Sequence, residues 1–235
     1  MTAGTFYAVG IGPGDPELLT RKAVTVLENC SVIAAPKVPS GEMLALRIAG
    51  GAVDLTKKNI IPLEFSMARN QTVRAAGYST AANSIAQALN EGQDVAMVNL
   101  GDVSIYSTAY YVLDELRRRG YETQMIPGIP SFCAVAAALG RSLTGPDDPL
   151  HIIPAGETDL DAALAMPGTK VLMKSGRSMP AAVAALERHG LAERSAMVAD
   201  CGLPTQQIFH SMRNLPEDIS YFATVIVPDV GFNPK

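Results

Sequence analysis

Residues 99–108 read NLGDVSIYST, and they place a Gly-Asp turn directly after an apolar segment of strand length. The turn combines Gly101, the carboxylate of Asp102 and four hydroxyl side chains within eight residues. A loop beyond the carboxyl end of a parallel strand is where open α/β sheets bind ligands. The stretch therefore predicts a ligand-binding loop. The simpler alternative is that the hydroxyls only cap a helix that begins near Ser107.

A second loop of this kind lies near the N-terminus, where residues 9–16 read VGIGPGDP after another apolar segment. Asp15 can cap the helix that follows, and Pro16 suits the first position of that helix. The glycines also let a ligand approach the backbone closely, with Pro13 against it. Both interpretations can hold at once.

The third loop, residues 126–132, reads IPGIPSF. Its two prolines are stiff and its glycine is free, so the loop can hold Ser131 and Phe132 in a fixed pose. An ordinary strand-to-helix turn capped by Ser131 fits the sequence equally well.

The first half of the chain alternates apolar segments with segments of helical periodicity, which predicts a parallel α/β sheet. The expected strands are residues 5–11, 31–35, 94–100 and 122–126, and the expected helices are residues 16–29, 80–90 and 108–119. Arginines at 117–119 followed by Gly120 are typical of a helix C-terminus. We place the domain boundary there, which gives domains at residues 1–119 and 120–235.

The second half is expected to form strands at residues 150–154, 169–174, 195–200, 207–212 and 221–227, with a surface loop at 143–149. The last three strands come without long helices between them, so we expect a mixed sheet with antiparallel members. Met173, at the end of one apolar strand, is either a core residue or a soft contact for a purine or a sulfonium group.

The composition is that of an ordinary globular protein: 48% of the 235 residues are hydrophobic, 18% are charged and the net charge is −4. Because no basic run interleaved with aromatic residues occurs, we expect no nucleic-acid partner. The sequence has neither an apolar run of membrane-spanning length nor an N-terminal signal segment. The expected location is therefore the cytoplasm, with no membrane association.

Cysteine and histidine usage disfavours a disulfide framework and a metal site. Cys30, Cys133 and Cys201 are odd in number and far apart, which favours reduced, buried thiols. The three histidines have no partner at metal-ligand spacing, so we expect no metal.

The glycines of residues 10–14 follow the pattern GxGxG and not the dinucleotide-binding pattern GxGxxG. The second strand ends in Pro36 and Lys37, where a nucleotide-binding unit carries an acidic residue. Both features disfavour an NAD-dependent oxidoreductase.

Taken in this order and spacing, the three loops resemble the motifs of the tetrapyrrole (corrin and siroheme) methyltransferases, which use S-adenosylmethionine. The segments LMK at 172–174 and YFATVIV at 221–227 extend the resemblance over nearly the whole chain. It implies two α/β domains with S-adenosylmethionine in the cleft between them. The N-terminal domain would form the tetrapyrrole side of that cleft and the C-terminal domain the cofactor side. A homodimer is also implied.

Within that family, residues 101–108 look most like the C20-methyltransferases of cobalamin synthesis, which act on precorrin-2 or its cobalt form, cobalt-factor II. Pro36 points the same way, because uroporphyrinogen methylases carry a carboxylate at about this position. The alternatives within the family are C11 or C17 methylation and diphthine synthesis. Outside it, they are an NAD-dependent oxidoreductase and a non-enzymatic nucleotide-sensing module.

The resemblance assigns cofactor contacts to residues of all the motifs: Pro13, Gly101, Asp102, Val103, Ile105, Tyr106, Ser131, Phe132, Met173, Gly202 and Ala223. Residues near the motifs are expected to meet the substrate and its many carboxylates: Gly12, Arg21, Lys37, Lys174 and Arg177. No catalytic residue is assigned, because the electron-rich macrocycle is itself the nucleophile. The sequence departs from the family pattern at Val103, where a proline is common, and at Gln206 and Gln207, where an acidic residue is frequent.

Overall fold

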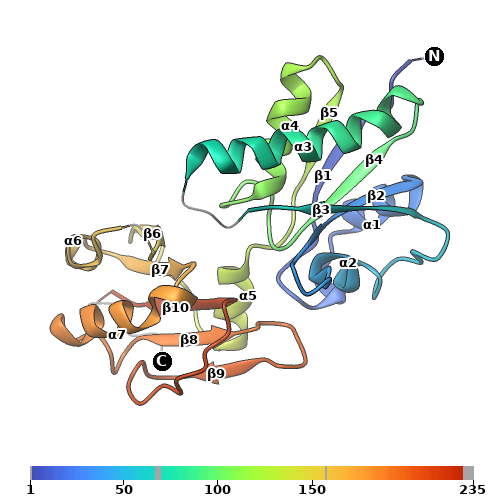
Figure 1. Cartoon of the computed structure of the whole chain (residues 1–235). Helices are drawn as coiled ribbons and strands as arrows, with labels where there is room; N and C mark the ends of the chain where they lie inside the picture. The colour runs from blue at the N-terminus through green and yellow to red at the C-terminus, as the bar shows by residue number, and fades with distance from the viewer. Residues whose placement is uncertain (1, 67–69, 157, 230–235) are drawn as a thin grey trace. The chain divides into compact units, whose positions relative to one another are not determined.

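The computed structural model describes residues 2–66, 70–156 and 158–229, and for Arg177 it describes the backbone only. The chain divides into two compact units, Met1–Pro130 and Ser131–Lys235 (Figure 1). The boundary therefore falls after Pro130 and not at residue 119, where the helix-ending signal suggested it. The reason is that β5 (Thr123–Ile126), which follows that signal, pairs with β1 (Phe6–Gly10) inside the first unit.

The first unit holds a five-stranded sheet in the order β3-β2-β4-β1-β5, with all pairs parallel. This confirms the parallel α/β sheet. Its other strands are β2 (Val32–Lys37), β3 (Asn59–Glu64) and β4 (Val95–Asn99), and its helices are α1 (Arg21–Asn29), α2 (Leu44–Ala49), α3 (Gln71–Asn90) and α4 (Thr108–Arg118). A short 3₁₀ turn, η1 (Pro16–Leu18), precedes α1. Every residue of β4 is buried, as a central strand of a parallel sheet requires.

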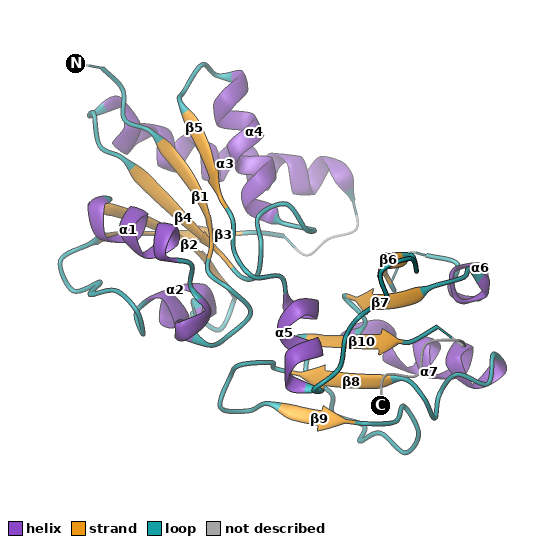
Figure 2. Ribbon diagram, turned by 180° about the vertical axis from the view of Figure 1, so that it is seen from behind, coloured by secondary structure: helices purple, strands orange, loops and turns teal. Residues whose placement is uncertain are grey.

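Helices cover both faces of this sheet: α1 and α2 lie on one face, and α3 and α4 lie on the other (Figure 2). The apolar residues of α4 recur at helical spacing and face the core: Ala109, Val112, Leu113 and Leu116. The neighbouring strands β1 and β4 are followed by helices on opposite faces. The loops after these two strands therefore part from each other at the carboxyl edge, which is the point where open sheets of this kind bind ligands.

Three expectations for the first unit differ from the structure. The edge strand β3 was not expected, because Pro62 interrupts its apolar residues and a proline within such a run argues against a strand in the interior of a sheet. The helix expected at 16–29 is interrupted, because Thr20 caps a new helix by accepting a hydrogen bond from the backbone N–H of Ala23. Helix α3 begins at Gln71 and not at residue 80, because its first turns are exposed on all sides and carry no periodic signal.

The second unit holds a five-stranded sheet in the order β6-β7-β10-β8-β9. Its strands are β6 (Leu150–Pro154), β7 (Thr169–Met173), β8 (Ala196–Ala199), β9 (Gln207–Phe209) and β10 (Ala223–Val227). Its helical segments are α5 (Ser131–Ala138), α6 (Leu160–Ala165), η2 (Gly176–Ser178) and α7 (Met179–Arg188). The pair β6–β7 is parallel and the other pairs are antiparallel, which confirms the mixed sheet.

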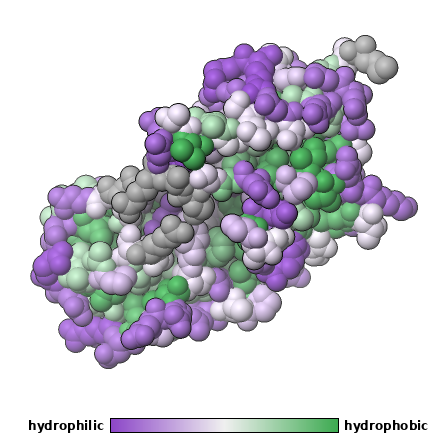
Figure 3. All heavy atoms as spheres, in the orientation of Figure 1, coloured by the Kyte–Doolittle hydropathy of each residue, from purple (hydrophilic) through white to green (hydrophobic). Residues whose placement is uncertain are grey.

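The surface and the thiols agree with the sequence-based expectations only in part. Among the described residues, no helix combines the length and the apolar character needed to cross a membrane. The face in Figure 3 intersperses hydrophilic residues with hydrophobic ones. All three cysteines are free, but only Cys30 and Cys201 are buried. Cys133 is exposed, contrary to expectation, because the neighbouring residues of α5, such as Phe132 and Val135, occupy its buried side.

The loops after β1, β4 and β5 meet through backbone atoms at the carboxyl edge of the first sheet. A Cβ on Gly10 would lie 2.6 Å from the backbone nitrogen of Gly128 and 2.8 Å from the carbonyl oxygen of Gly101. A Cβ on Gly128 would lie 2.7 Å from the carbonyl carbon of Gly10 and closer still to the oxygen of Gly101. Only glycine permits this approach at these two positions.

We expect Gly128→Ala to lower the free energy of unfolding by about 1–3 kcal/mol, because its Cβ would overlap the backbone of the two neighbouring loops. Gly77→Ala in α3 is the matched control. Nothing lies within 4 Å of its Cβ, and alanine should stabilise the helix by about 0.5–1 kcal/mol. Urea unfolding of both variants measures the pair. A Gly128→Ala protein as stable as the wild type would contradict the close packing of the three loops.

Candidate functional site

A small antiparallel bridge joins the loops after β1 and β4, at Gly12 and Gly101, before the two loops continue to helices on opposite faces of the sheet. The N–H of Gly101 donates to the carbonyl of Gly12 at 2.8 Å, and the N–H of Gly12 donates to the carbonyl of Gly101 at 3.3 Å. Both glycines have positive φ angles, of 75° and 76°. Gly101 is buried, but a Cβ on it would meet nothing within 4 Å, so there is space beside its Cα that no other part of the protein fills.

Asp102 connects the loop after β4 to the loop after β5. Its Oδ1 accepts hydrogen bonds from the backbone N–H of Ser104, at 2.7 Å, and from the Ser104 hydroxyl. Its Oδ2 accepts one from the backbone N–H of Gly128, at 2.8 Å. The carboxylate that was expected to face a ligand therefore also serves the protein itself, as a clamp between two loops.

The ionisation of Asp102 is set by opposing effects on its pKa. Burial raises the pKa, while hydrogen bonds from the side chain and backbone of Ser104 and from the N–H groups of Gly128 and Val103 lower it. The net pKa lies below the ordinary value for aspartate. Asp102 is therefore a carboxylate at neutral pH, and its bonds to both loops are charge-assisted.

The hydroxyl of Ser107 does not cap α4, so the capping alternative is wrong for this residue. Ser107 occupies the cap position, but its side chain makes no capping hydrogen bond. Its buried hydroxyl instead donates to Oδ1 of Asn99 at 2.8 Å. The Nδ2 of Asn99 donates in turn to the carbonyls of Leu100 and Asp102. Together these bonds fix the course of the loop from inside.

The remaining predicted residues of the first unit differ in what they expose. Pro13 and Val103 are buried, and Val103 belongs to the hydrophobic core, so their side chains face the protein. Ile105 is half-buried. Tyr106 is exposed and has a positive φ of 49°, a strained conformation for a residue with a side chain. Strain of this kind is found at ligand-binding segments more often than elsewhere.

The predicted residues of the second unit gather at one edge of its sheet. Because β10 runs antiparallel to β7 and β8, its first residue, Ala223, lies at the same edge as Met173 at the end of β7 and Gly202 after β8. Ser131, at the start of α5, reaches this strand: its Oγ lies 3.2 Å from Oγ1 of Thr224. Phe132 is buried beside it in the same helix.

The backbone dominates this second edge as well. Ala223 is buried, and its carbonyl accepts a hydrogen bond from the buried Ser175 hydroxyl at 3.3 Å. Gly202 has a φ of 81°, and its N–H donates to Oε1 of Gln206 at 2.8 Å. Gln206, which departs from the family pattern, thus closes its own loop in this chain.

The expected substrate-binding residues lie next to these loops and differ in their surroundings. Lys37 ends β2 and its Nζ lies 3.7 Å from Oε1 of Glu64. Arg21 is exposed at the start of α1, next to Thr20, whose hydroxyl donates to the carbonyl of Pro127. Lys174 is exposed after β7, with a φ of 54°. The side chain of Arg177 lies outside the described part of the chain.

The sequence reasoning missed Asp200, whose environment resembles that of Asp102. Asp200 directly follows β8, and hydroxyls of Thr205 and Ser220 donate to its two carboxylate oxygens. The signal that identified Asp102, an aspartate at the end of an apolar segment, is present at residues 195–200 and could have identified Asp200 as well.

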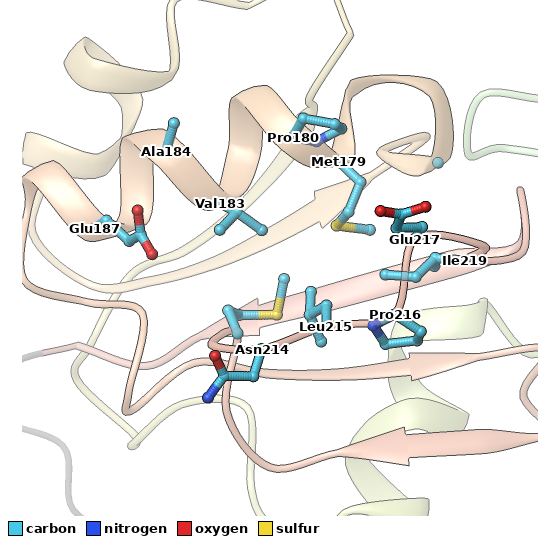
Figure 4. A pocket seen from close by; sticks show the side chains of 12 residues that line it. Met179, Pro180, Val183, Ala184, Glu187, Asn214, Leu215, Pro216, Glu217 and Ile219 are labelled. Atoms are coloured by element: carbon cyan, nitrogen blue, oxygen red, sulfur yellow. The ribbon is translucent and has the colours of Figure 1, made fainter.

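A shallow groove of about 610 Å³ lies elsewhere on the second unit, between α7 and residues 212–219 (Figure 4). Apolar side chains line it, including Met179, Val183 and Leu215, with Glu187 and Glu217 as carboxylates. Among the residues whose side chains the structure describes, none of those predicted to bind cofactor or substrate lines this groove.

The histidines engage in local contacts. His151 Nε2 lies 2.8 Å from the carbonyl oxygen of Pro167, and His189 Nε2 lies 2.9 Å from Oδ1 of Asp161. The described residues contain no group of three or more histidine, cysteine or acidic side chains arranged to hold a metal ion.

Comparison with known proteins gives a consistent result. The family model of the tetrapyrrole (corrin/porphyrin) methylases matches residues 5–215. A probable cobalt-precorrin-2 C(20)-methyltransferase of Methanocaldococcus jannaschii is 37% identical over 72% of this chain and 71% of its own length. A cobalt-precorrin-2 C(20)-methyltransferase of Salmonella typhimurium is 27% identical over 95% of this chain and 96% of its own length.

Among solved structures, the uroporphyrin-III C-methyl transferase from Thermus thermophilus complexed with S-adenyl homocysteine matches with a TM-score of 0.71. The match covers 96% of this chain and 92% of that structure at 20% sequence identity. At this identity the match confirms the expected two-domain α/β fold.

The Asp102 clamp has a testable pH dependence. Because the folded-state pKa is below the unfolded value of about 3.9, ionised Asp102 stabilises the fold fully above about pH 4. This contribution is lost as the pH falls through the folded-state pKa. Asp102→Asn should therefore cost about 1–2 kcal/mol of unfolding free energy at pH 7 and little at low pH.

Urea unfolding of wild type and Asp102→Asn between pH 7 and pH 3 measures this difference. Ser104→Ala, which removes one of the donors to the carboxylate, should show a smaller difference with the same pH trend. A difference that stays constant over the range would contradict a role for the Asp102 charge.

Proposed function

Because the chain belongs to the tetrapyrrole (corrin/porphyrin) methylases, we propose that it transfers a methyl group from S-adenosylmethionine to C20 of precorrin-2 or cobalt-factor II. The reaction is a step of cobalamin biosynthesis. The observation that carries this proposal is the similarity, over most of the chain, to relatives named as cobalt-precorrin-2 C(20)-methyltransferases. The departure at Pro36 from the carboxylate of uroporphyrinogen methylases supports the same choice.

The residues at the two sheet edges fit the chemistry of S-adenosylmethionine. The ligand carries ribose hydroxyls, a carboxylate, an ammonium group and a purine, and exposed backbone groups can hydrogen-bond to all of them. The space that a Cβ on Gly101 would leave uncontacted gives room for part of a ligand beside this loop. We therefore assign cofactor binding to both clusters, residues 101–106 with Pro13 in the first unit, and Ser131, Phe132, Met173, Gly202 and Ala223 in the second.

The chain's own contribution to the reaction is positioning. When bound, S-adenosylmethionine supplies an electrophilic methyl group, and the substrate's meso carbon is the nucleophile. The protein needs to hold the reacting atoms at near-attack distance, which can lower a barrier by several kcal/mol. The clamp of Asp102 on Ser104 and Gly128 serves this purpose by fixing the loops that bind the cofactor.

Cations near the loops are assigned to the substrate's peripheral carboxylates. Arg21, Lys37 and Lys174 stand beside the cofactor-binding loops in sequence and at the strand ends. Ion pairs between such cations and carboxylates orient a ligand as well as bind it.

We also propose that the enzyme works in the cytoplasm as a homodimer. Light scattering on the purified protein measures its oligomeric state.

We expect the wild-type protein to bind S-adenosylhomocysteine in calorimetry and to bind no NADH. Asp102→Ala should weaken S-adenosylhomocysteine binding by about 1.5–3 kcal/mol, because charge-assisted hydrogen bonds that shape the loop are lost. NADH binding without S-adenosylhomocysteine binding would overturn the assignment of the cofactor.

Asp54→Ala is the matched control for this measurement. Like Asp102, Asp54 accepts hydrogen bonds at Oδ1 from the N–H and the hydroxyl of the residue two positions later, Thr56. It precedes β3 and so lies at the opposite, amino edge of the parallel sheet. Its replacement should leave cofactor affinity unchanged, and equal losses in both variants would assign the effect to general destabilisation.

The regiochemistry gives a separate test. We expect the enzyme to add one methyl group to a precorrin-2-type ring, at C20, and to leave uroporphyrinogen III unchanged. The physical reason is that a macrocycle held by its carboxylates presents one edge to the methyl donor, and in-line transfer tolerates little misplacement.

Incubation with methyl-labelled S-adenosylmethionine and each ring in turn, followed by carbon NMR, locates the label. Running metal-free and cobalt-loaded rings in parallel decides between the two substrate forms. Label on a pyrrole carbon, or dimethylation of uroporphyrinogen III, would refute C20 specificity while leaving the family assignment intact.

A further inference from the structure

Asp200 ties together two segments at the carboxyl edge of the second sheet. Its Oδ2 accepts a hydrogen bond from Oγ1 of Thr205 at 2.8 Å, and its Oδ1 accepts one from Oγ of Ser220. Its backbone N–H donates to the carbonyl of Phe222 at 3.0 Å, and its carbonyl accepts from the N–H of Leu203 at 2.9 Å. Both the side chain and the backbone of this residue are therefore engaged.

The segments joined in this way carry two of the residues assigned to the cofactor. The segment 200–206 contains Gly202, and the segment 220–222 leads directly into Ala223. The hydroxyl of Ser220 also accepts a hydrogen bond from the N–H of Phe222, at 3.2 Å, so the second segment is held immediately before Ala223. A change in the bonds of Asp200 would therefore move both backbone positions.

The backbone of Asp200 lies in the left-handed region, with a φ of 52°. Aspartate and asparagine adopt this conformation more readily than most residues with a side chain, and the surroundings must still hold it there. The hydrogen bonds at both ends of Asp200 supply that restraint. Such a conformation at the end of a buried strand turns the chain sharply toward Gly202.

We propose that Asp200 is a positioning residue for the cofactor: by binding Thr205 and Ser220, it holds the backbone at Gly202 and Ala223 in the geometry that accepts S-adenosylmethionine. It does so without touching the cofactor. The proposal rests on the proposed function, because it assigns a role within that same site. It gives the second unit a clamp equivalent to the one that Asp102 forms in the first unit.

The test uses variants that remove one partner at a time. Asp200→Asn keeps the size of the side chain and tolerates the left-handed backbone, but it loses the charge and one acceptor position. Thr205→Val removes the hydroxyl donor, and Thr205→Ser retains it. Asp161→Asn is the matched control in the same unit, since both oxygens of Asp161 also accept hydrogen bonds, from Arg188 and His189 on the surface.

We expect Asp200→Asn to weaken S-adenosylhomocysteine binding about ten-fold in calorimetry and Thr205→Val to weaken it about five-fold. Thr205→Ser and Asp161→Asn should bind within about two-fold of wild type. In steady-state assays, Asp200→Asn should raise KM for S-adenosylmethionine in parallel with the loss of affinity. Its kcat should change much less, because correctly bound cofactor still reacts. The double variant Asp200→Asn/Thr205→Val should lose less binding free energy than the sum of the two single losses, since both changes break the same hydrogen-bond network.

The outcomes separate the two hypotheses. If the wild type binds no S-adenosylhomocysteine, the proposed function itself is wrong. If the wild type binds but Asp200→Asn, Thr205→Val and Ser220→Ala all retain its affinity, only the positioning role is refuted, and reduced urea stability alone would not rescue it. If Asp200→Asn does not fold, the contrast between Thr205→Val and Thr205→Ser decides the matter, because equal affinities in that pair would exclude the clamp.

Discussion

The structure of the first unit depends on the contact of three glycine backbones, at Gly10, Gly101 and Gly128, where the loops after β1, β4 and β5 meet. No side chain fits between these strands' ends, so the loops cannot shift independently of one another. The charged clamp of Asp102 on Gly128 then fixes the third loop to the second. Because these contacts are made by backbone atoms, they help to fix the course of the chain through residues 101–106 without engaging the exposed side chains of that segment.

Both units place an aspartate within three residues of the end of a buried strand, and the reason is physical. Where a strand ends, the hydrogen-bond ladder stops, and the N–H and hydroxyl groups of the loop need acceptors. In native proteins a buried backbone N–H group rarely remains without one. A carboxylate offers two oxygens with several acceptor positions. Asp102 uses them for Ser104 and Gly128, and Asp200 uses them for Thr205 and Ser220. The two units differ in topology, but the same demand at their strand ends produces the same kind of clamp.

The sequence predicts elements with a clear burial pattern and fails where burial is partial. Strand β4 was recognisable because all its residues are buried, whereas the edge strand β3 buries only Leu63 fully and contains Pro62. The first turns of α3 lack an apolar face for the same reason. The domain boundary was misplaced because Arg117–Gly120 carries a correct helix-ending signal, while the pairing of β5 with β1 joins residues more than a hundred positions apart. A local sequence signal can thus predict where a helix ends, whereas the domain boundary depends on which strands pair over long distances in the sequence.

The same distinction applies to the site. Turn chemistry located the loops, but the partners of Asp102, Ser107 and Ser131 were not predictable, since they follow from packing. The polar side chains of the loops proved to be engaged largely with one another and with backbone groups, so they hold the loops in place. This explains how the chain can depart from its family at Val103, where a proline is common. Val103 is anchored by burial in the core, and Asp102 beside it accepts hydrogen bonds from Ser104 and Gly128. Packing and a charged clamp thus supply the rigidity that a proline ring would otherwise give.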